Sequence, residues 1–158
     1  ETLLGYQLFS IGNRADSAAL VYQVDYVLDG YVKKAGTNFV LSVGRLIGSQ
    51  PELKGEQRLR KEDIYWEMPR CYQWDITVNL PEGYRISPEG LERLNVKVEN
   101  DCGAFIVQAT TEDGTLRIKA EKRINHKTEP VANWEKLLEI TDAANSYEAL
   151  SIVFPSNH

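Results

Sequence analysis

The sequence predicts a mainly β fold, an antiparallel β-sandwich of the immunoglobulin-like or jelly-roll-like kind with one short helix near the C-terminus. The strongest strand signal lies at residues 71–80, where apolar and polar side chains alternate with the period of two that a pleated strand requires. Similar segments recur along the chain, separated by turns that contain glycine, proline or asparagine. One segment near the C-terminus instead has apolar residues at helical spacing. Together these observations indicate antiparallel strands joined by turns.

The composition is that of one globular domain, which we expect to span residues 1–158. Of the 158 residues, 42% are hydrophobic and 26% are charged, which is enough apolar material for a core. The net charge of -5 argues against a surface for nucleic acid or an anionic membrane, because both need a basic patch. No apolar run approaches the roughly 20 residues of a membrane-spanning helix.

The first part of the chain predicts four strands, at residues 2–11, 18–28, 31–34 and 39–43. Gly5 is a candidate bulge in the first strand, and a turn is expected at residues 12–17. In the second strand every other residue from Ala18 to Leu28 is apolar, so these residues share a face. Asp29-Gly30 is a hairpin signal between the second and third strands.

Residues 44–62 are the main irregular region. We expect a long loop there, because the 43 residues before it make a poor independent core. A short aromatic strand at residues 63–68 and the strand at 71–80 follow, each stopped by a proline. Residues 82–91 are expected to form a loop.

The C-terminal part predicts two hairpins, a helix and a last strand. Strands are expected from residue 94 to 99, from 105 to 109 and from 115 to 124, with turns at Asn100-Asp101 and Glu112-Asp113-Gly114. A helix is expected to begin at Thr128-Glu129-Pro130 and to end near Ala144-Asn145, with Trp134 on its apolar face. The last strand is expected at residues 150–154.

The two cysteines, Cys71 and Cys102, leave two alternatives open. In an oxidising compartment they could pair, and in a reducing one they would stay free. Pairing requires that the strands following them run the same way.

The order of the elements resembles the C-terminal β domain of unknown function that follows the transglutaminase-like core of bacterial multidomain proteins. The residues that carry the resemblance are Arg58 and Asp63, the turn Leu80-Pro81-Glu82-Gly83-Tyr84, Pro88, and the helix with Trp134. The resemblance covers most of the chain, and colinearity rather than any one motif carries it.

The resemblance implies a non-catalytic accessory domain, one that packs on, or positions substrate for, a transglutaminase-like or protease-like core. The implied partners are upstream domains of the same parent chain, and the implied location is extracytoplasmic, in the periplasm or at the cell surface. The chain begins at Glu1 and enters a strand at once, which we interpret as an excised piece or a processed chain.

No constellation in the sequence predicts an enzyme or a cofactor. Cys102, His126 and Asp142 occur in the order of a transglutaminase-like triad, but Cys102 lies in a strand turn rather than at a helix N-terminus that would activate a thiol. There is no recognised spacing of metal ligands and no glycine-rich phosphate loop.

Aromatic residues are the remaining candidates for a site. Tyr72 and Trp74 lie on the apolar face of their strand, so we expect them in the core. Tyr65 and Trp66 are the better candidates for exposed binding residues. The alternative function is therefore a module that binds glycan through these rings, or an extended peptide through them or a free edge strand.

Overall fold

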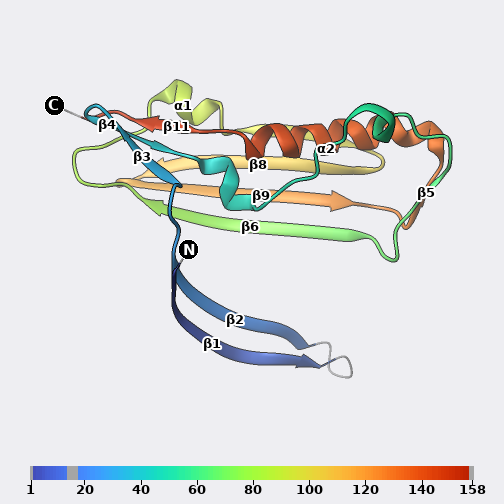
Figure 1. Ribbon diagram of the computed structural model, residues 1–158, viewed down its shortest axis with the longest axis horizontal. Coiled ribbons are helices and arrows are strands. Elements are labelled where there is room, and N and C mark those ends of the chain that lie inside the picture. The colour runs from blue at the N-terminus through green and yellow to red at the C-terminus, as the bar shows by residue number, and fades with distance from the viewer. Residues whose placement is uncertain (1, 14–17, 157–158) are drawn as a thin grey trace. The chain divides into compact units, whose positions relative to one another are not determined.

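The computed structural model describes residues 2–13 and 18–156 (Figure 1). It divides into two compact units, Glu1–Val32 and Lys33–His158. The expectation of a single domain over residues 1–158 stays a prediction. The fold class is confirmed, because the described chain is mainly antiparallel strand with one long helix near the C-terminus.

The first unit is a hairpin of two long strands, β1 (Thr2–Asn13) and β2 (Ala18–Val27). The register shifts between Leu3 and Gly5, which confirms the irregularity predicted beside that glycine. A second shift lies between Leu8 and Ser10. Residues 14–17 of the expected turn lie outside the described residues.

The second unit holds the remaining strands. A four-stranded antiparallel sheet has the order β6-β9-β8-β7, with β6 (Arg70–Asn79), β7 (Val96–Asn100), β8 (Gly103–Glu112) and β9 (Thr115–Ile124). A smaller sheet has the order β11-β4-β3, with β3 (Val32–Ala35), β4 (Asn38–Leu41) and β11 (Ile152–Phe154). Two short strands, β5 (Ile64–Tyr65) and β10 (Thr128–Glu129), pair with each other.

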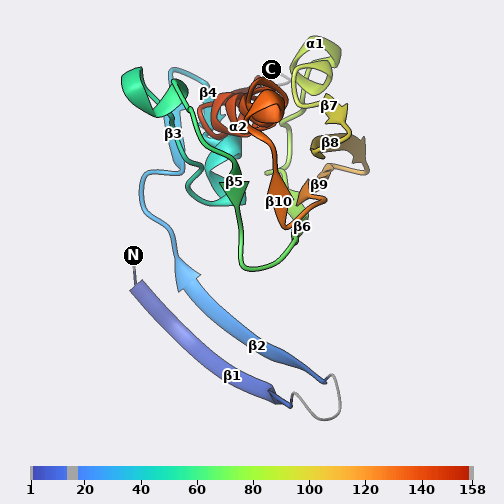
Figure 2. The same ribbon diagram turned by 90° about the vertical axis from the view of Figure 1, so that its right-hand side faces the viewer.

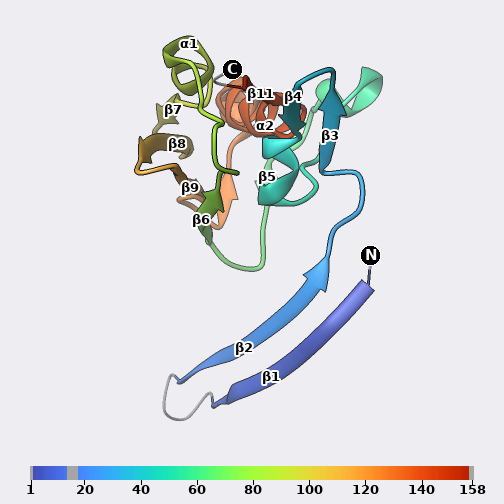
Figure 3. The same cartoon turned by 90° about the vertical axis from the view of Figure 1, so that its left-hand side faces the viewer.

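The helices are α1 (Pro88–Glu92) and α2 (Trp134–Glu148), and there are three 3-10 segments, η1 (Val43–Ile47), η2 (Gly55–Arg58) and η3 (Val131–Asn133). Figures 2 and 3 view the four-stranded sheet nearly end-on, and in both α2 lies between it and the smaller sheet. Within the described residues, no helix is long and apolar enough to cross a bilayer.

The strand predicted at residues 71–80 is confirmed as β6, which pairs with β9 along its whole length. The hairpin between β8 and β9 turns at Asp113 and Gly114, whose φ angles are 47° and 72°. Such positive values match the twist of the strands that the turn joins. The sequence signal at Glu112-Asp113-Gly114 is therefore also confirmed.

The core lies between α2 and the inner face of the four-stranded sheet. Phe105 of β8 meets Tyr147 of α2 edge to face, with ring centroids 5.8 Å apart. Both side chains are buried, together with Leu116 and Ile118 on β9. Alternation along β9 therefore places Leu116, Ile118 and Ala120 in the core.

Three predictions about the pairing, start or end of an element are wrong. Asp29 and Gly30 do form a turn, but β3 pairs with β4, and no pairing of β2 with β3 is found in the described residues. Thr128–Glu129 is strand β10 rather than a helix start, because it pairs with β5. The helix α2 continues to Glu148, since buried Tyr147 packs its last turn onto the sheet.

One helix, α1, forms across the end of the expected loop at residues 82–91. The Ser87 side chain accepts a hydrogen bond from the Gly90 backbone N–H at 3.0 Å, and Pro88 occupies the first helical turn. Both are ordinary helix-start signals, so this helix could have been predicted. The expected loop at 44–62 is largely irregular as predicted, apart from η1 and η2.

Candidate functional site

A groove with a volume of about 470 Å³ lies along the inner face of β6. The alternation of that strand directs Tyr72 and Trp74 to this face, where their rings stack at a centroid distance of 6.0 Å and an angle of 22°. Trp66 comes from the segment after β5, and Gln50 from the loop after η1. The full lining is Ile47, Ser49, Gln50, Pro51, Trp66, Arg70, Tyr72, Trp74, Lys122, Ile124 and Thr141.

Lys122 is a partly buried cation in this groove. It lies on β9 directly across from Tyr72, on the face that otherwise carries the core residues. Its Nζ donates a hydrogen bond to Gln50 Oε1 at 2.9 Å, and burial lowers the pKa of the amine. Among the residues that the structure describes, no carboxylate comes within salt-bridge distance of it.

Gln50 connects this amine to the helix. Its backbone N–H donates to the Glu148 carboxylate, while its side-chain oxygen accepts from Lys122. The loop after η1 is thus tied both to α2 and to β9. The wall of the groove is held in place by these two bonds.

Lys122 was not predicted as a site residue, although the sequence contains a pattern that indicates it. Alternate residues of β9 are apolar at Leu116, Ile118, Ala120 and Ile124, and the lysine interrupts that series. A cation at an inward-facing position of a strand is uncommon, because burial of an unpaired charge is unfavourable. An inward-facing lysine in an apolar series is therefore the pattern that points to this site.

The two predicted binding residues lie differently. Trp66 lines the groove, whereas Tyr65 is 64% exposed and its ring lies under Lys127 Nζ, 5.2 Å from the centroid. Tyr72 and Trp74 were expected in the core, and instead they are exposed and half-buried. They reach solvent because β6 is the edge of its sheet. A binding role for Tyr65 and Trp66 stays a prediction.

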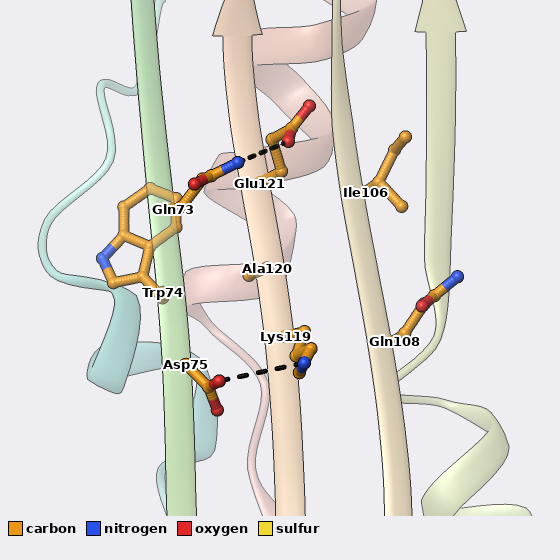
Figure 4. A pocket seen from close by; sticks show the side chains of 8 residues that line it. All are labelled: Gln73, Trp74, Asp75, Ile106, Gln108, Lys119, Ala120 and Glu121. Atoms are coloured by element: carbon orange, nitrogen blue, oxygen red, sulfur yellow. Dashed lines mark hydrogen bonds and ion pairs between the residues drawn. The ribbon is translucent and has the colours of Figure 1, made fainter.

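A second hollow lies on the opposite face of the same sheet (Figure 4). Its charged groups have partners on the sheet, since Lys119 lies 3.9 Å from Asp75 and Glu121 lies 3.4 Å from Arg123 and accepts a bond of 3.0 Å from Gln73. Such cross-strand pairs stabilise a solvated sheet face. Each charged side chain that lines this hollow, Asp75, Lys119 and Glu121, therefore has an oppositely charged partner, unlike Lys122.

The three residues that occur in triad order, Cys102, His126 and Asp142, are bonded to other groups. Asp142 binds the guanidinium of Arg58 through two bonds of 2.8 Å, so it serves as an anchor for η2 on the helix. Cys102 is buried, and burial, followed by the nearby Glu129 carboxylate, raises the pKa of its thiol. A thiol with a raised pKa is a poor nucleophile.

Glu129 lies between Cys102 and His126. It is buried, and its two oxygens meet His126 Nδ1 at 2.5 Å and Asn133 Nδ2 at 2.7 Å. Burial alone would raise the pKa of this carboxyl, but the bonds from Asn133 and His126 outweigh burial and hold the pKa below its usual value. The Glu129 carboxylate thus bonds both His126 and Asn133, and these bonds hold the segment between β10 and α2 in place.

Metal ligation finds no support in the described residues, where no group of three histidine, cysteine or acidic side chains is placed to hold an ion. Both cysteines are free thiols, Cys71 exposed and Cys102 buried. The sequence left open whether Cys71 and Cys102 form a disulfide. In the structure they do not.

The hairpin of the first unit carries an apolar face. Its cross-strand pairs Leu3–Tyr26, Tyr6–Val24, Leu8–Tyr22 and Ile11–Leu20 point to one side. Seven of these eight side chains are between 45% and 81% exposed. The opposite face carries the pairs Gln7–Gln23, Gly5–Asp25, Ser10–Val21 and Thr2–Val27, so it is more polar but includes two valines. The hairpin thus has one face suited to burial and one suited to water.

Comparison with known proteins identifies a family. A family model described as "Domain of Unknown Function with solved-structure structure (DUF3858)" matches residues 43–154. No curated protein and no solved structure matches the chain. The matched residues include the four-stranded sheet, α2 and the groove, and leave the β1–β2 hairpin outside. The chain therefore belongs to the DUF3858 family of domains of unknown function.

Proposed function

We propose that this chain is a non-catalytic accessory domain of a larger, extracytoplasmic protein, and that it packs on, or positions substrate for, a transglutaminase-like core. The apolar face of the β1–β2 hairpin carries this proposal. A contiguous apolar surface of this kind marks an interaction site, and a two-stranded hairpin is marginally stable in water without a partner surface.

The second support is the placement of the chemistry-bearing residues. Asp142 is committed to Arg58, and Glu129 separates the buried Cys102 from His126. A nucleophile needs an adjacent base and a thiol that ionises readily. The thiol of Cys102 has a raised pKa, and the acid beside it, Glu129, is already bonded to His126 and Asn133, which fits a domain whose parent supplies the catalytic residues elsewhere.

Calorimetric titration of the chain into the separately expressed transglutaminase-like core of its parent protein tests the proposal. We expect saturable binding that Leu8→Lys and Tyr22→Lys abolish, because both place a charge on the apolar face. Gln7→Lys and Gln23→Lys are the matched controls, since they put the same charge on the opposite face of the same strands.

Two results would overturn the proposal. One is the absence of heat of binding with the unaltered chain. The other is an equal loss of affinity in all four variants, since that would show that charge, rather than the apolar face, governs the interaction.

A second candidate function is binding of a glycan or peptide in the aromatic groove. The stacked rings of Tyr72 and Trp74 favour it, because exposed rings on a sheet face can stack on sugars or apolar side chains. A polysaccharide retardation gel checks the glycan arm. If none of several polysaccharides retards the protein in the gel, glycan binding is excluded.

A further inference from the structure

Three features of the groove point to one kind of ligand. The first is charge, since its lining contains two cations, Arg70 and Lys122, and no carboxylate. The chain as a whole carries a net charge of -5, so this cationic groove runs against the overall charge. A complementary ligand is an anion.

The second feature is that Lys122 has no counter-ion and has unused hydrogen-bond donors among the described residues. An amine has three donors, and the described residues use one of them, for Gln50. A partly buried cation without a counter-ion is unfavourable for folding, and such groups are concentrated at functional sites. A ligand carboxylate would supply both the missing charge and an acceptor.

The third feature is the free edge of β6. This strand is the outer member of its sheet, so half of its backbone N–H and C=O groups have no strand partner in the described chain. An extended peptide can add to such an edge, with main-chain bonds giving affinity and alternate side chains entering a neighbouring pocket. Tyr72 and Trp74 of β6 lie beside that edge and face the groove.

We propose that β6 and its groove bind an extended acidic peptide, which adds as a strand to the free edge and places a carboxylate against Lys122 and Arg70. The rings of Trp66, Tyr72 and Trp74 receive its apolar side chains. This inference rests on the second candidate function, the groove as a binding site, and is independent of hairpin docking.

A pair of blocked heptapeptides tests the proposal on the full chain. Both alternate valine and threonine around one central residue, which is glutamate in the first and glutamine in the second. We expect the glutamate peptide to bind about 10-fold or more tightly, because a hydrogen bond to a charged group is worth more than a neutral one. N-methylation of every other peptide nitrogen should abolish binding, since strand addition needs those donors.

The three tryptophan indoles report where the peptide binds. The nuclear magnetic resonance signals of Trp66 and Trp74 should shift on titration. The indole of Trp134 donates to the Arg58 carbonyl at 2.8 Å outside the groove, so its signal should stay in place.

Lys122→Met should remove the preference for glutamate over glutamine while keeping the aliphatic stem. Lys119→Met is the matched control, because it removes the same charge from the opposite face of β9 and should leave the preference intact. Because the glutamate and glutamine peptides are compared on the unaltered protein, the preference for an acidic peptide is tested even if Lys122→Met does not fold.

Equal affinity of the two peptides would overturn the acidic preference, and the absence of binding by either would overturn the peptide site. An acidic glycan such as oligogalacturonate that binds more tightly than the peptide, and is lost in Lys122→Met, would assign the groove to a carbohydrate instead. Each of these outcomes leaves the calorimetric test of hairpin docking unaffected.

Discussion

At the scale of single residues, Gly44 shows how closely the segments of the second unit approach one another. Its backbone N–H donates to the Leu150 carbonyl, and a Cβ at this position would lie 1.8 Å from the Tyr147 carbonyl oxygen. Gly44→Ala must therefore displace η1 from the end of α2. We expect a loss of at least about 2 kcal/mol in the free energy of unfolding, measured by urea titration.

Gly5→Ala is the control for that substitution. The nearest atom to its added methyl group is Asp25 Oδ2 at 3.4 Å, which is an ordinary contact. Its stability should change by less than about 1 kcal/mol. A Gly44→Ala chain as stable as this control would show that η1 and α2 are not packed as described.

Glu129 predicts a dependence of stability on pH. Its pKa is lower in the folded chain than in the unfolded one, so its contribution is complete above the unfolded value of about 4.3 and is lost as the pH falls through the folded value. Glu129→Gln should cost about 1–2 kcal/mol at pH 7, because charge-assisted bonds become neutral ones. The difference from the unaltered chain should shrink below about pH 4. A difference that is the same at pH 7 and pH 3.5 would contradict this reading.

The two thiols should differ in reactivity. Cys71 is exposed, whereas Cys102 is buried and its thiol has a raised pKa. Iodoacetamide should therefore modify Cys71 alone in the native protein, and both cysteines after denaturation. Peptide mass spectrometry reads the sites directly, and rapid native labelling of Cys102 would reopen the case for a reactive thiol.

At the scale of elements, α1 depends on a local cap. Ser87→Ala removes the acceptor for the Gly90 N–H and should lower stability by about 1 kcal/mol. Ser151→Ala, in the exposed segment before β11, should change it by less than about 0.5 kcal/mol. Equal effects in thermal denaturation would mean that the cap contributes nothing.

The elements also show what the sequence could predict. The long strands β6, β8 and β9 were found because burial on one face favours a period of two, which most of their residues follow. The strand at Thr128–Glu129 was not predicted because it depends on β5, a partner distant in sequence. A two-residue strand carries no periodicity of its own. The pairing of β3 with β4 is local, since only Gly36 and Thr37 separate the two strands, so the glycine turn between them could have indicated it.

The groove was only partly predictable for the same reason. Trp66 was named as a candidate, but the wall opposite it comes from Gln50 and Lys122, which lie 16 residues before and 56 residues after it. Tyr72 and Trp74 were assigned to the core because the sequence does not say which strand is the sheet edge. Strand order, a tertiary property, decided their exposure.

At the scale of the whole molecule, the chain combines a family domain with a hairpin outside the matched residues. The domain has its own core of sheet and helix, whereas the hairpin exposes most of its apolar side chains. These features fit the two proposals, in which the family domain binds a ligand in its groove and the hairpin docks on the transglutaminase-like core. Each half of that account has its own test.

Hydrogen–deuterium exchange of the chain, alone and with the transglutaminase-like core, tests the central claim most directly. Amides of β1 and β2 should exchange rapidly in the chain alone, because a two-stranded sheet opens readily. They should become protected when the core is added, while β8 and β9 stay protected in both states. Unchanged exchange in the hairpin under saturating core would contradict the docking account.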